Sequence, residues 1–238
     1  MKTAAILLAA GESTRAGTPK PLLPWFGATL VERQVEALLR AGVSDVFVVT
    51  GHRADNVRAH LRGEPVHPVF NSRYRDGRAT SVRAGLAALP PDTQAVVLLG
   101  VDQPRPVWLR RRVLEAHAAK RALITCPRYA GRGGQPIVLD ASLAGELETI
   151  SDERQGVRQV VRAHAEQVNW VEVDTPLARL DLNTPEAYRE ACRTFPDPRR
   201  EAEGDAGAAR GMGLTPSPCL DRRTSQGRFH RPEEEAIP

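Results

Sequence analysis

The stretch ILLAAGESTRAGTPKPLL, residues 6–23, decides how the rest of the sequence is interpreted. It begins with a short apolar run, Ile6 to Ala10, of the kind found in a central parallel strand. Gly11 then allows the backbone to turn sharply and to approach a ligand closely. The following loop offers peptide N–H groups, two hydroxyls and two positive charges that can bind an anion (Ser13, Thr14, Arg15 and Lys20). The stretch therefore predicts a nucleotide phosphate site after a buried strand.

Two common phosphate-binding loops do not match this stretch. A Walker loop needs four residues between its glycines and then Lys followed by Ser or Thr, whereas Gly11 and Gly17 enclose five residues and Thr18 follows. The dinucleotide fingerprint needs a glycine where Ser13 stands. Both mismatches argue against a P-loop kinase and a dehydrogenase.

The stretch does resemble the motif Leu-Ala-Ala-Gly-x-Ser-x-Arg-Met-Gly-x-x-Lys-x-Leu-Leu of the molybdopterin cytidylyltransferases, a group within the MobA-like nucleotidyltransferases. Ala16 is the departure, because the family usually has Met there. The resemblance implies that Arg15 and Lys20 are catalytic. It also implies a nucleotide-binding set from this stretch (Ala9, Ala10, Gly11, Ser13, Arg15 and Lys20). The alternative is an ordinary strand–turn–helix junction with a surface Arg and Lys.

Length and composition favour one domain in the cytoplasm. The chain has 238 residues, of which 41% are hydrophobic, and a formal net charge of +4. The basic residues form no long stripe interleaved with aromatics, so nucleic-acid binding is not indicated. The three cysteines are widely spaced, as in reduced cytosolic proteins. The apolar run after Lys2 is short for a signal peptide, and no segment reaches the roughly 20 apolar residues that cross a bilayer.

Apolar runs alternate with helical patterns along most of the chain, which is typical of a mostly parallel sheet. Strands are expected at residues 4–9, 46–50, 66–70, 95–101, 122–126 and 168–173, and helices at 30–41, 53–61, 80–89, 106–119, 155–164 and 185–192. The pattern predicts an α/β fold, and the resemblance implies a single Rossmann-like, three-layer α/β/α domain of the nucleotide-diphospho-sugar transferase type. We expect this domain to occupy residues 1–194. The composition of residues 195–238 predicts a disordered tail.

A second motif is Ala95-Val-Val-Leu-Leu-Gly-Val-Asp-Gln-Pro104. An apolar strand that delivers Asp102 at its carboxyl end places a carboxylate at the ligand-binding edge of an α/β sheet. Mg²⁺ prefers carboxylate oxygens and takes substrate phosphates as further ligands, so Asp102 is the first metal candidate. The stretch resembles the family's Asp-Gln-Pro motif, whose Asp coordinates the magnesium of the nucleotide. The alternative is that Asp102 caps the following helix.

A third stretch, residues 71–86, resembles the family pattern Asn-x-x-Trp/Tyr-x-x-Gly-Met-x-x-Ser-Leu-x-x-Gly-Leu. Arg78 stands where Met is usual, and Val82 where Leu is usual. In related cytidylyltransferases this turn lies against the base, which implies nucleotide contacts from Gly77, Thr80 and Ser81. From the residues alone, Thr80 or Ser81 caps a helix that starts at Val82, and this role is compatible with a base contact.

Residues 179–188 resemble the family's Asp-Ile-Asp/Asn-Thr-Pro-Glu-Asp motif. Asp181 is the second metal candidate, and Asn183 competes with it because related enzymes place this ligand at slightly different offsets. The alternative is that Thr184 and Pro185 begin the last helix. In a weaker match, residues 131–139, Gln135 replaces the His or Asn of a loop that faces the acceptor in the family, which leaves the identity of the acceptor open.

The resemblance implies a Mg²⁺-dependent nucleotidyltransferase. A phosphate oxygen of the acceptor attacks the α-phosphorus of a nucleoside triphosphate, and pyrophosphate leaves. Ala10 resembles the cytidylyl branch, which favours CTP, with molybdopterin as the acceptor and a molybdenum hydroxylase as a possible protein partner. An alternative acceptor is a sugar phosphate or another phosphorylated small molecule.

A non-catalytic nucleotide-binding protein that carries molybdenum cofactor is the alternative from another class. The departures from the family pattern favour it, whereas the charged residues that remain favour catalysis (Arg15, Lys20 and Asp102).

Overall fold

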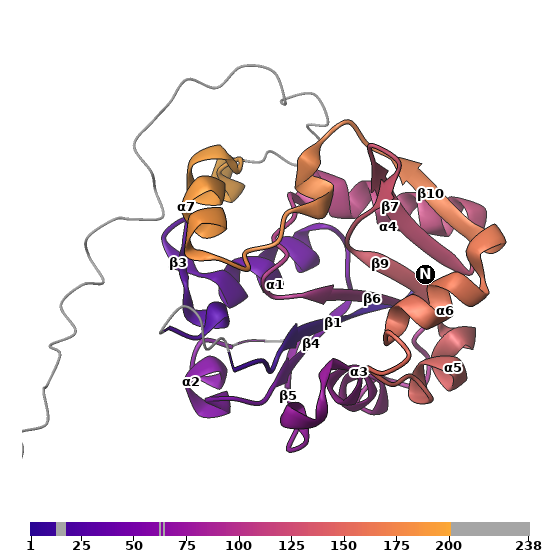
Figure 1. The fold of residues 1–238 in the computed structure, drawn as a ribbon, viewed down its shortest axis with the longest axis horizontal. Helices are drawn as coiled ribbons and strands as arrows, with labels where there is room; N and C mark the ends of the chain where they lie inside the picture. The colour runs from indigo at the N-terminus through magenta and orange to yellow at the C-terminus, as the bar shows by residue number, and fades with distance from the viewer. Residues whose placement is uncertain (13–17, 62, 64, 201–238) are drawn as a thin grey trace, which may run out of the picture.

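The computed structural model describes residues 1–12, 18–61, 63 and 65–200. Within these residues one eight-stranded sheet forms the centre of the molecule (Figure 1). Its strands are β1 (Thr3–Ala9), β4 (Asp45–Thr50), β5 (Val66–Phe70), β6 (Ala95–Gly100), β7 (Ile124–Tyr129), β8 (Arg132–Gly133), β9 (Ile137–Asp140) and β10 (Val168–Glu172). A separate two-stranded ribbon consists of β2 (Pro24–Trp25) and β3 (Ala28–Thr29).

The strand order is β10-β7-β9-β6-β1-β4-β5, with β8 paired to β7. β1 pairs in parallel with β4 on one side and with β6 on the other, so Ile6 lies between Phe47 and Leu98. β9 is antiparallel to both of its neighbours, β6 and β7. The expected mostly parallel α/β sheet is therefore confirmed, with β9 as an inserted antiparallel strand.

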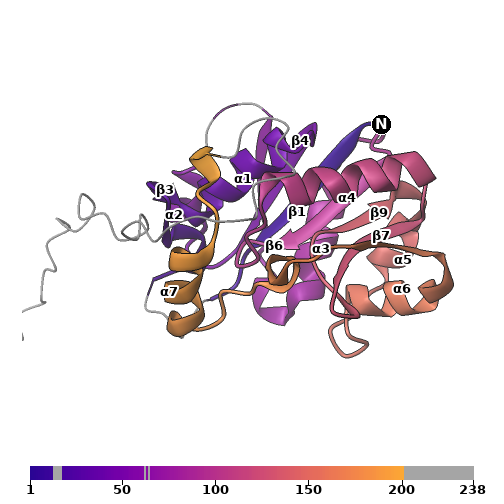
Figure 2. The same cartoon turned by 90° about the horizontal axis from the view of Figure 1, so that it is seen from above.

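Helices cover both faces of this sheet. They are α1 (Leu30–Arg40), α2 (Ala54–Arg58), α3 (Arg78–Ala87), α4 (Val107–Lys120), α5 (Ala144–Glu148), α6 (Val157–Ala163) and α7 (Pro185–Thr194). Figure 2 shows α1 and α4 on one side of the sheet and α5 and α6 on the other. Each helix expected from the sequence is present, and α5 is an addition.

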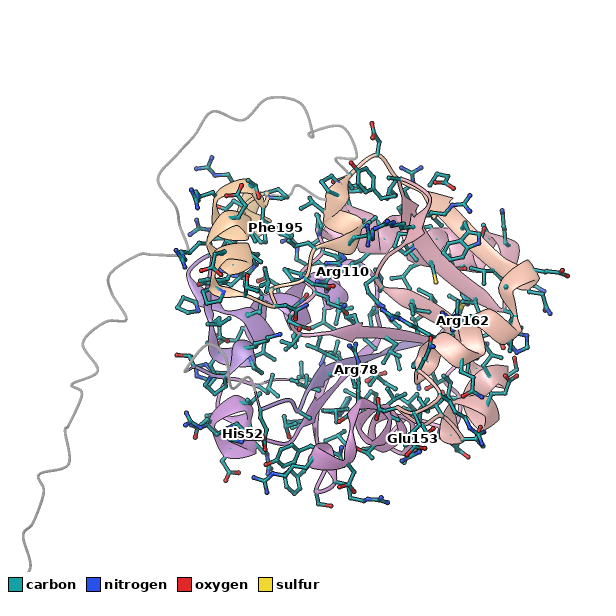
Figure 3. The ribbon with its side chains drawn as sticks, in the orientation of Figure 1. His52, Arg78, Arg110, Glu153, Arg162 and Phe195 are labelled. Carbon is teal, nitrogen blue, oxygen red and sulfur yellow. The ribbon has the colours of Figure 1, made fainter. Side chains whose placement is uncertain are left out.

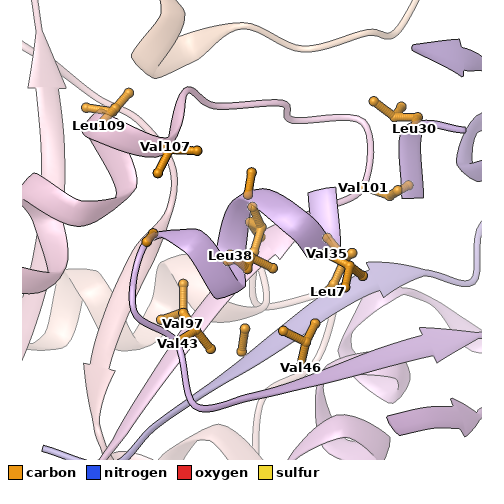
Figure 4. Packing of buried hydrophobic residues seen from close by; sticks show 14 of the residues in the cluster. Leu7, Leu30, Val35, Leu38, Val43, Val46, Val97, Val101, Val107 and Leu109 are labelled. Carbon is orange, nitrogen blue, oxygen red and sulfur yellow. The ribbon is translucent and has the colours of Figure 1, made fainter. Parts of the chain in front are cut away.

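β1 contributes to a hydrophobic core on each face of the sheet. Ala5, Leu7 and Ala9 belong to the cluster packed under α1 and α4, part of which Figure 4 shows. Ile6 and Leu8 belong to the cluster under α3, α5 and α6. Because successive side chains of a strand point to opposite faces, a strand covered on both faces must be apolar throughout. This is the physical reason for the uninterrupted apolar run that precedes Gly11.

Helix α1 shows how local sequence and packing agree. Its buried face includes Leu30, Val31, Val35 and Leu38, as the helical spacing predicts. The Thr29 hydroxyl accepts a hydrogen bond from the Glu32 N–H, and the Glu32 carboxylate accepts one from the Thr29 N–H, which forms a capping box. The helix is thus fixed at its start and along its apolar side.

The packed body extends past residue 194, where we expected the ordered domain to end. Phe195 is buried, and its ring lies 5.3 Å from that of Trp25. Arg40 donates a hydrogen bond to the carbonyl of Pro198 at 2.7 Å. Residues 201–238, most of the expected tail, lie outside the described residues. No helix in the described ranges is both long and apolar enough to cross a membrane.

His117 predicts a pH dependence of stability. It lies on α4, is 1% exposed, and its Nδ1 is 2.9 Å from Thr125 Oγ1 of β7. Burial lowers the pKa of His117 below its ordinary value of 6.5, with a smaller opposing effect from Asp140. The unfolded chain therefore binds more protons, and the free energy of unfolding should fall as the pH drops through about 6.5 towards 5.

Denaturant unfolding of wild type and His117→Gln between pH 8 and 5 measures this effect. We expect the variant to lose less stability over this range than wild type does. Parallel pH profiles for the two proteins would show that His117 does not carry the dependence.

Candidate functional site

The chain reverses its direction across the sheet between β1 and β6. After β1 it adds β4 and β5 on one side, and then it returns through α3 to place β6 on the other side of β1. In open α/β sheets, ligands bind at the carboxyl ends of the strands at such a point. A pocket of about 790 Å³ lies here. Its lining is formed by residues 8–11, Lys20, Pro21, Leu23, Tyr74, Gly77, Arg78, Ser81, Val101, Asp102, residues 182–185 and Tyr188.

Lys20 joins the two segments that the sequence marked as phosphate site and metal site. Its Nζ donates to Asp102 Oδ2 at 2.7 Å and to Asn183 Oδ1 at 2.9 Å. The Lys20 and Asp102 side chains are 22% and 24% exposed. These groups come from three distant segments of the chain, so their convergence is a property of the fold.

The backbone around Asp102 holds its carboxylate at the pocket. A Cβ on Gly100 would stand 2.5 Å from Asp102 Oδ1, so a larger residue there would displace the Asp102 carboxylate. The Gly100 N–H donates to Gln103 Oε1 at 2.8 Å, and the Leu182 N–H donates to the Asp102 carbonyl at 2.8 Å. Helix α4 begins at Val107 with Pro106 before it, and no side chain caps it. The alternative that Asp102 is a helix cap is therefore wrong.

The two candidates for the second metal ligand, Asp181 and Asn183, have different surroundings. Asp181 Oδ1 accepts a hydrogen bond from Gln103 Nε2 at 2.8 Å, and Asp181 is not part of the pocket lining. Asn183 lines the pocket and shares Lys20 with Asp102. Thr184 caps α7 by accepting from the Ala187 N–H at 3.1 Å, as the alternative interpretation of this segment predicted.

Arg105, three residues after Asp102, ties three segments of the chain together. It is 2% exposed, and its guanidinium donates to the carbonyls of Pro104, Leu180 and Gln135 at 2.8, 2.5 and 3.1 Å. Burial lowers the pKa of Arg105 to about 10, against which Asp181 and Asp102 act, so it stays charged at neutral pH. The role of Arg105 could not be predicted from the sequence, because nothing in its local pattern distinguishes it from a surface arginine.

The start of α3 forms another part of the pocket wall. Gly77 has φ of +108°, and a Cβ there would stand 2.0 Å from Asp152 Oδ2. That carboxylate accepts a hydrogen bond from the Ala79 N–H at 2.9 Å, so Asp152 of a distant segment caps the helix. The expectation that Thr80 or Ser81 is the cap is wrong, because α3 begins at Arg78.

Thr80 and Ser81 have different surroundings. The Thr80 hydroxyl donates to the carbonyls of Arg73 and Gly77 and accepts from Asn71 Nδ2 at 2.9 Å. Thr80 is buried and does not line the pocket, whereas Ser81 and Gly77 do. Asn71 also donates to Ser81 Oγ at 3.0 Å. Of the three nucleotide contacts predicted on this segment, two face the pocket and Thr80 holds the turn together.

The remaining predicted residues divide into three groups. Ala9, Ala10 and Gly11 line the pocket at the end of β1, and the position of a Cβ on Gly11 is open space. Ser13 and Arg15 lie outside the described residues. Gln135 is not part of the pocket lining; its N–H donates to the Ala178 carbonyl at 2.9 Å, and its buried Oε1 has no hydrogen-bond partner among the described residues.

The oxygen atoms at the pocket suit a hard divalent cation. Asp102 Oδ2 and Asn183 Oδ1 already converge on one positive group, the Lys20 ammonium. No group of three or more His, Cys, Asp or Glu side chains in the described part of the chain can hold a metal. A cation here would take one carboxylate, one amide oxygen and further ligands from a phosphate substrate, as Mg²⁺ does when it binds with nucleotides.

The pocket lies where the strand order reverses, and a strand-end glycine, a lysine and a carboxylate line it. These features define the class as a nucleotide-binding α/β protein. Residues 5–181 match the family model described as MobA-like NTP transferase domain. The chain therefore belongs to this family of nucleotidyltransferases.

Known relatives share most of this chain. "Nicotine blue oxidoreductase" of Paenarthrobacter nicotinovorans is 33% identical over 189 residues, which cover 76% of this chain and 92% of that one. The crystal structure of Rv0371c from Mycobacterium tuberculosis H37Rv has a TM-score of 0.70 and 29% identity, and it covers 80% of this chain and 97% of that one. A structure of Rv0371C in complex with manganese has a TM-score of 0.66 and 27% identity over the same shares.

Arg105→Met tests whether the buried guanidinium holds the site segments in place. Three carbonyl oxygens would lose a charged donor, so we expect the free energy of unfolding to fall by about 2–4 kcal/mol in urea unfolding. Arg112→Met on the exposed side of α4 is the matched control and should change stability by less than about 0.5 kcal/mol. Equal stability of the two variants would contradict the assignment.

Proposed function

We propose that this protein transfers a cytidylyl group from CTP to molybdopterin or a closely similar phosphorylated acceptor, with Mg²⁺ as cofactor and release of pyrophosphate. The observation that carries the proposal is the convergence of Lys20, Asp102 and Asn183 at the carboxyl ends of β1 and β6. Family membership supports nucleotidyl transfer in general. The preference for CTP is supported by Ala10 in the resemblance to the cytidylyl branch.

The reaction needs no protein nucleophile. An oxygen of the acceptor phosphate forms a bond to the α-phosphorus, the bond between the α-phosphorus and its bridging oxygen to the β-phosphate breaks, and pyrophosphate leaves with the electron pair. The acceptor phosphate dianion has no proton to lose, so positioning and charge neutralisation carry the catalysis. Lys20, together with Arg15, is assigned to the triphosphate and to the charge that develops around the α-phosphorus.

We assign the metal to Asp102 and Asn183 in place of the expected pair Asp102 and Asp181. The support is that Asn183 lines the pocket, while Asp181 Oδ1 is occupied by Gln103. When bound, Mg²⁺ would neutralise phosphate charge and help orient the triphosphate. Lys20 would then release Asp102 and Asn183 and contact the phosphates. The ammonium and the metal would thus both neutralise phosphate charge in the same pocket.

The other parts of the proposal concern partners and domain organisation. A molybdenum hydroxylase is the proposed recipient of the product, and residues 1–194 with the packed extension to Arg200 are the proposed transferase domain. Gln135 lies outside the pocket lining, so its loop does not favour one acceptor over another.

Loss of the two central charges tests the assignment. Lys20→Ala and Asp102→Ala should retain the fold, because both side chains lie at the pocket surface, but should lose at least about 100-fold in pyrophosphate release. The assay is run with four nucleoside triphosphates and with molybdopterin or sugar phosphates as acceptors. Lys120→Ala, at the exposed end of α4, is the control. Near-normal turnover in either pocket variant would contradict the mechanism.

A second pair of variants separates the two metal candidates. Asn183→Ala should raise the Mg²⁺ concentration needed for half-maximal activity by about tenfold, because one oxygen ligand is lost. Asp181→Asn should leave this concentration near that of wild type, and its residual effect should reflect the contact with Gln103. The reverse order, measured in the same Mg²⁺ and Mn²⁺ titrations, would restore Asp181 as the ligand.

The relative named an oxidoreductase raises a second candidate, because its alignment covers nearly all of that protein. A change in the oxidation state of nicotine blue, the compound in the name of that relative, would indicate oxidoreductase activity instead of transfer. Tight binding of molybdopterin with neither pyrophosphate release nor turnover of nicotine blue would instead indicate a carrier. Pyrophosphate release that requires both a nucleotide and an acceptor would support the transferase.

A further inference from the structure

Arg78 brings a second positive side chain to the pocket, apart from the Lys20 contact. It is the first residue of α3, and it lines the pocket together with Gly77 and Ser81. Figure 3 labels it at the start of this helix, and the residue is exposed. The family pattern that this stretch resembles usually has Met at this position, so Arg78 is a departure from that pattern.

Its guanidinium has no hydrogen bond or ion pair with another described residue, unlike the arginines near it. Arg73 pairs with Asp76 at 2.9 Å, and Arg75 pairs with Glu12 at 2.8 Å. Arg83 of the same helix donates to the Ile150 carbonyl at 2.7 Å. Of these four arginines, Arg78 is the one that lines the pocket.

The backbone of Arg78 is nevertheless fixed. Gly77 before it occupies a left-handed φ against Asp152, and that carboxylate binds the N–H of Ala79 after it. Thr80 further closes the turn onto the Gly77 carbonyl at 2.8 Å. A fixed backbone with a free donor group is suited to recognise a particular ligand edge, because little of the binding energy is lost in ordering the wall.

We propose that Arg78 selects the base of the nucleotide. This inference rests on the proposed function, since it takes the phosphates to lie at Lys20 and Asp102 and the base to reach the wall formed by α3. A guanidinium is a planar fork of donors and has no acceptor, so it pairs with two adjacent acceptor atoms. Cytosine offers O2 and N3 in this arrangement. Uracil places an N–H donor at position 3, which faces the fork with the wrong polarity.

The expected specificity follows from this polarity. The protein should bind CTP more tightly than UTP, whose N3 is a donor, and more tightly than ATP, because no edge of adenine offers two adjacent acceptors: N1 and N7 each lie beside the amino donor and N3 stands alone. GTP is the sharpest competitor, since guanine presents O6 and N7 together, a common partner of arginine. A bidentate arginine contact distinguishes between bases by roughly 10- to 100-fold, which sets the size of the effect.

Direct binding of the four nucleoside triphosphates with Mg²⁺, measured by titration calorimetry, tests this without the acceptor. Arg78→Met should weaken CTP binding by about 10- to 100-fold and leave UTP binding nearly unchanged. Arg78→Lys should also lose the discrimination, because an ammonium keeps the charge but not the fork. Arg112→Met on α4 is the matched control, and thermal unfolding confirms that each variant is folded.

Each other outcome has a defined meaning. Equal weakening of all four nucleotides in Arg78→Met, restored in Arg78→Lys, would assign Arg78 to the phosphates and overturn base selection while the proposed function stands. Unchanged nucleotide binding with an increased KM for the acceptor would overturn it in favour of acceptor recognition. Failure of the wild-type protein to bind any nucleotide would overturn the proposed function, and this inference with it.

Discussion

Strand β1 is buried on both faces of the sheet and hydrogen-bonded to a parallel neighbour on each side, and the rest of the structure depends on this position. A central strand has no free edge, and every residue of β1 is buried, so a ligand can approach only where the chain leaves the carboxyl end of the strand. The chain leaves that end at Gly11, beside the point where the strand order reverses. The same constraint therefore produces a stable core and places the pocket at the end of this strand.

The ion pair between Lys20 and Asp102 positions two groups at the pocket and contributes little to stability. Both side chains are partly exposed, so solvent screens the pair and its contribution to stability is small. Holding opposite charges together instead keeps both groups at the pocket before a ligand arrives. A polyphosphate with its cation can separate them by offering each a better partner, so the pair is consistent with a site organised in advance for a charged ligand.

The sequence predicted those features that local pattern determines. The apolar run of β1, the apolar face of α1 and the strand that carries Asp102 all follow from periodicity, and the structure confirms them. It did not predict the antiparallel insertion of β9, because strand order depends on which edges meet and leaves no local signal. Thr80 illustrates the same limit, since its hydroxyl could bind a ligand or a carbonyl and only the fold decides between them.

The residues that the sequence could not reveal act across long separations. Asp152 caps a helix that begins at Arg78, and Arg105 binds carbonyls of residues far along the chain. Such contacts join segments that are far apart in the chain, as does the Leu182 N–H that donates to the Asp102 carbonyl beside Asn183. A motif can therefore name the groups that do chemistry, whereas the relative placement of those groups depends on buried polar residues outside the motifs. Arg78 is a further example. Its guanidinium can select a ligand only because Gly77 and Asp152 hold its backbone at the wall of the pocket.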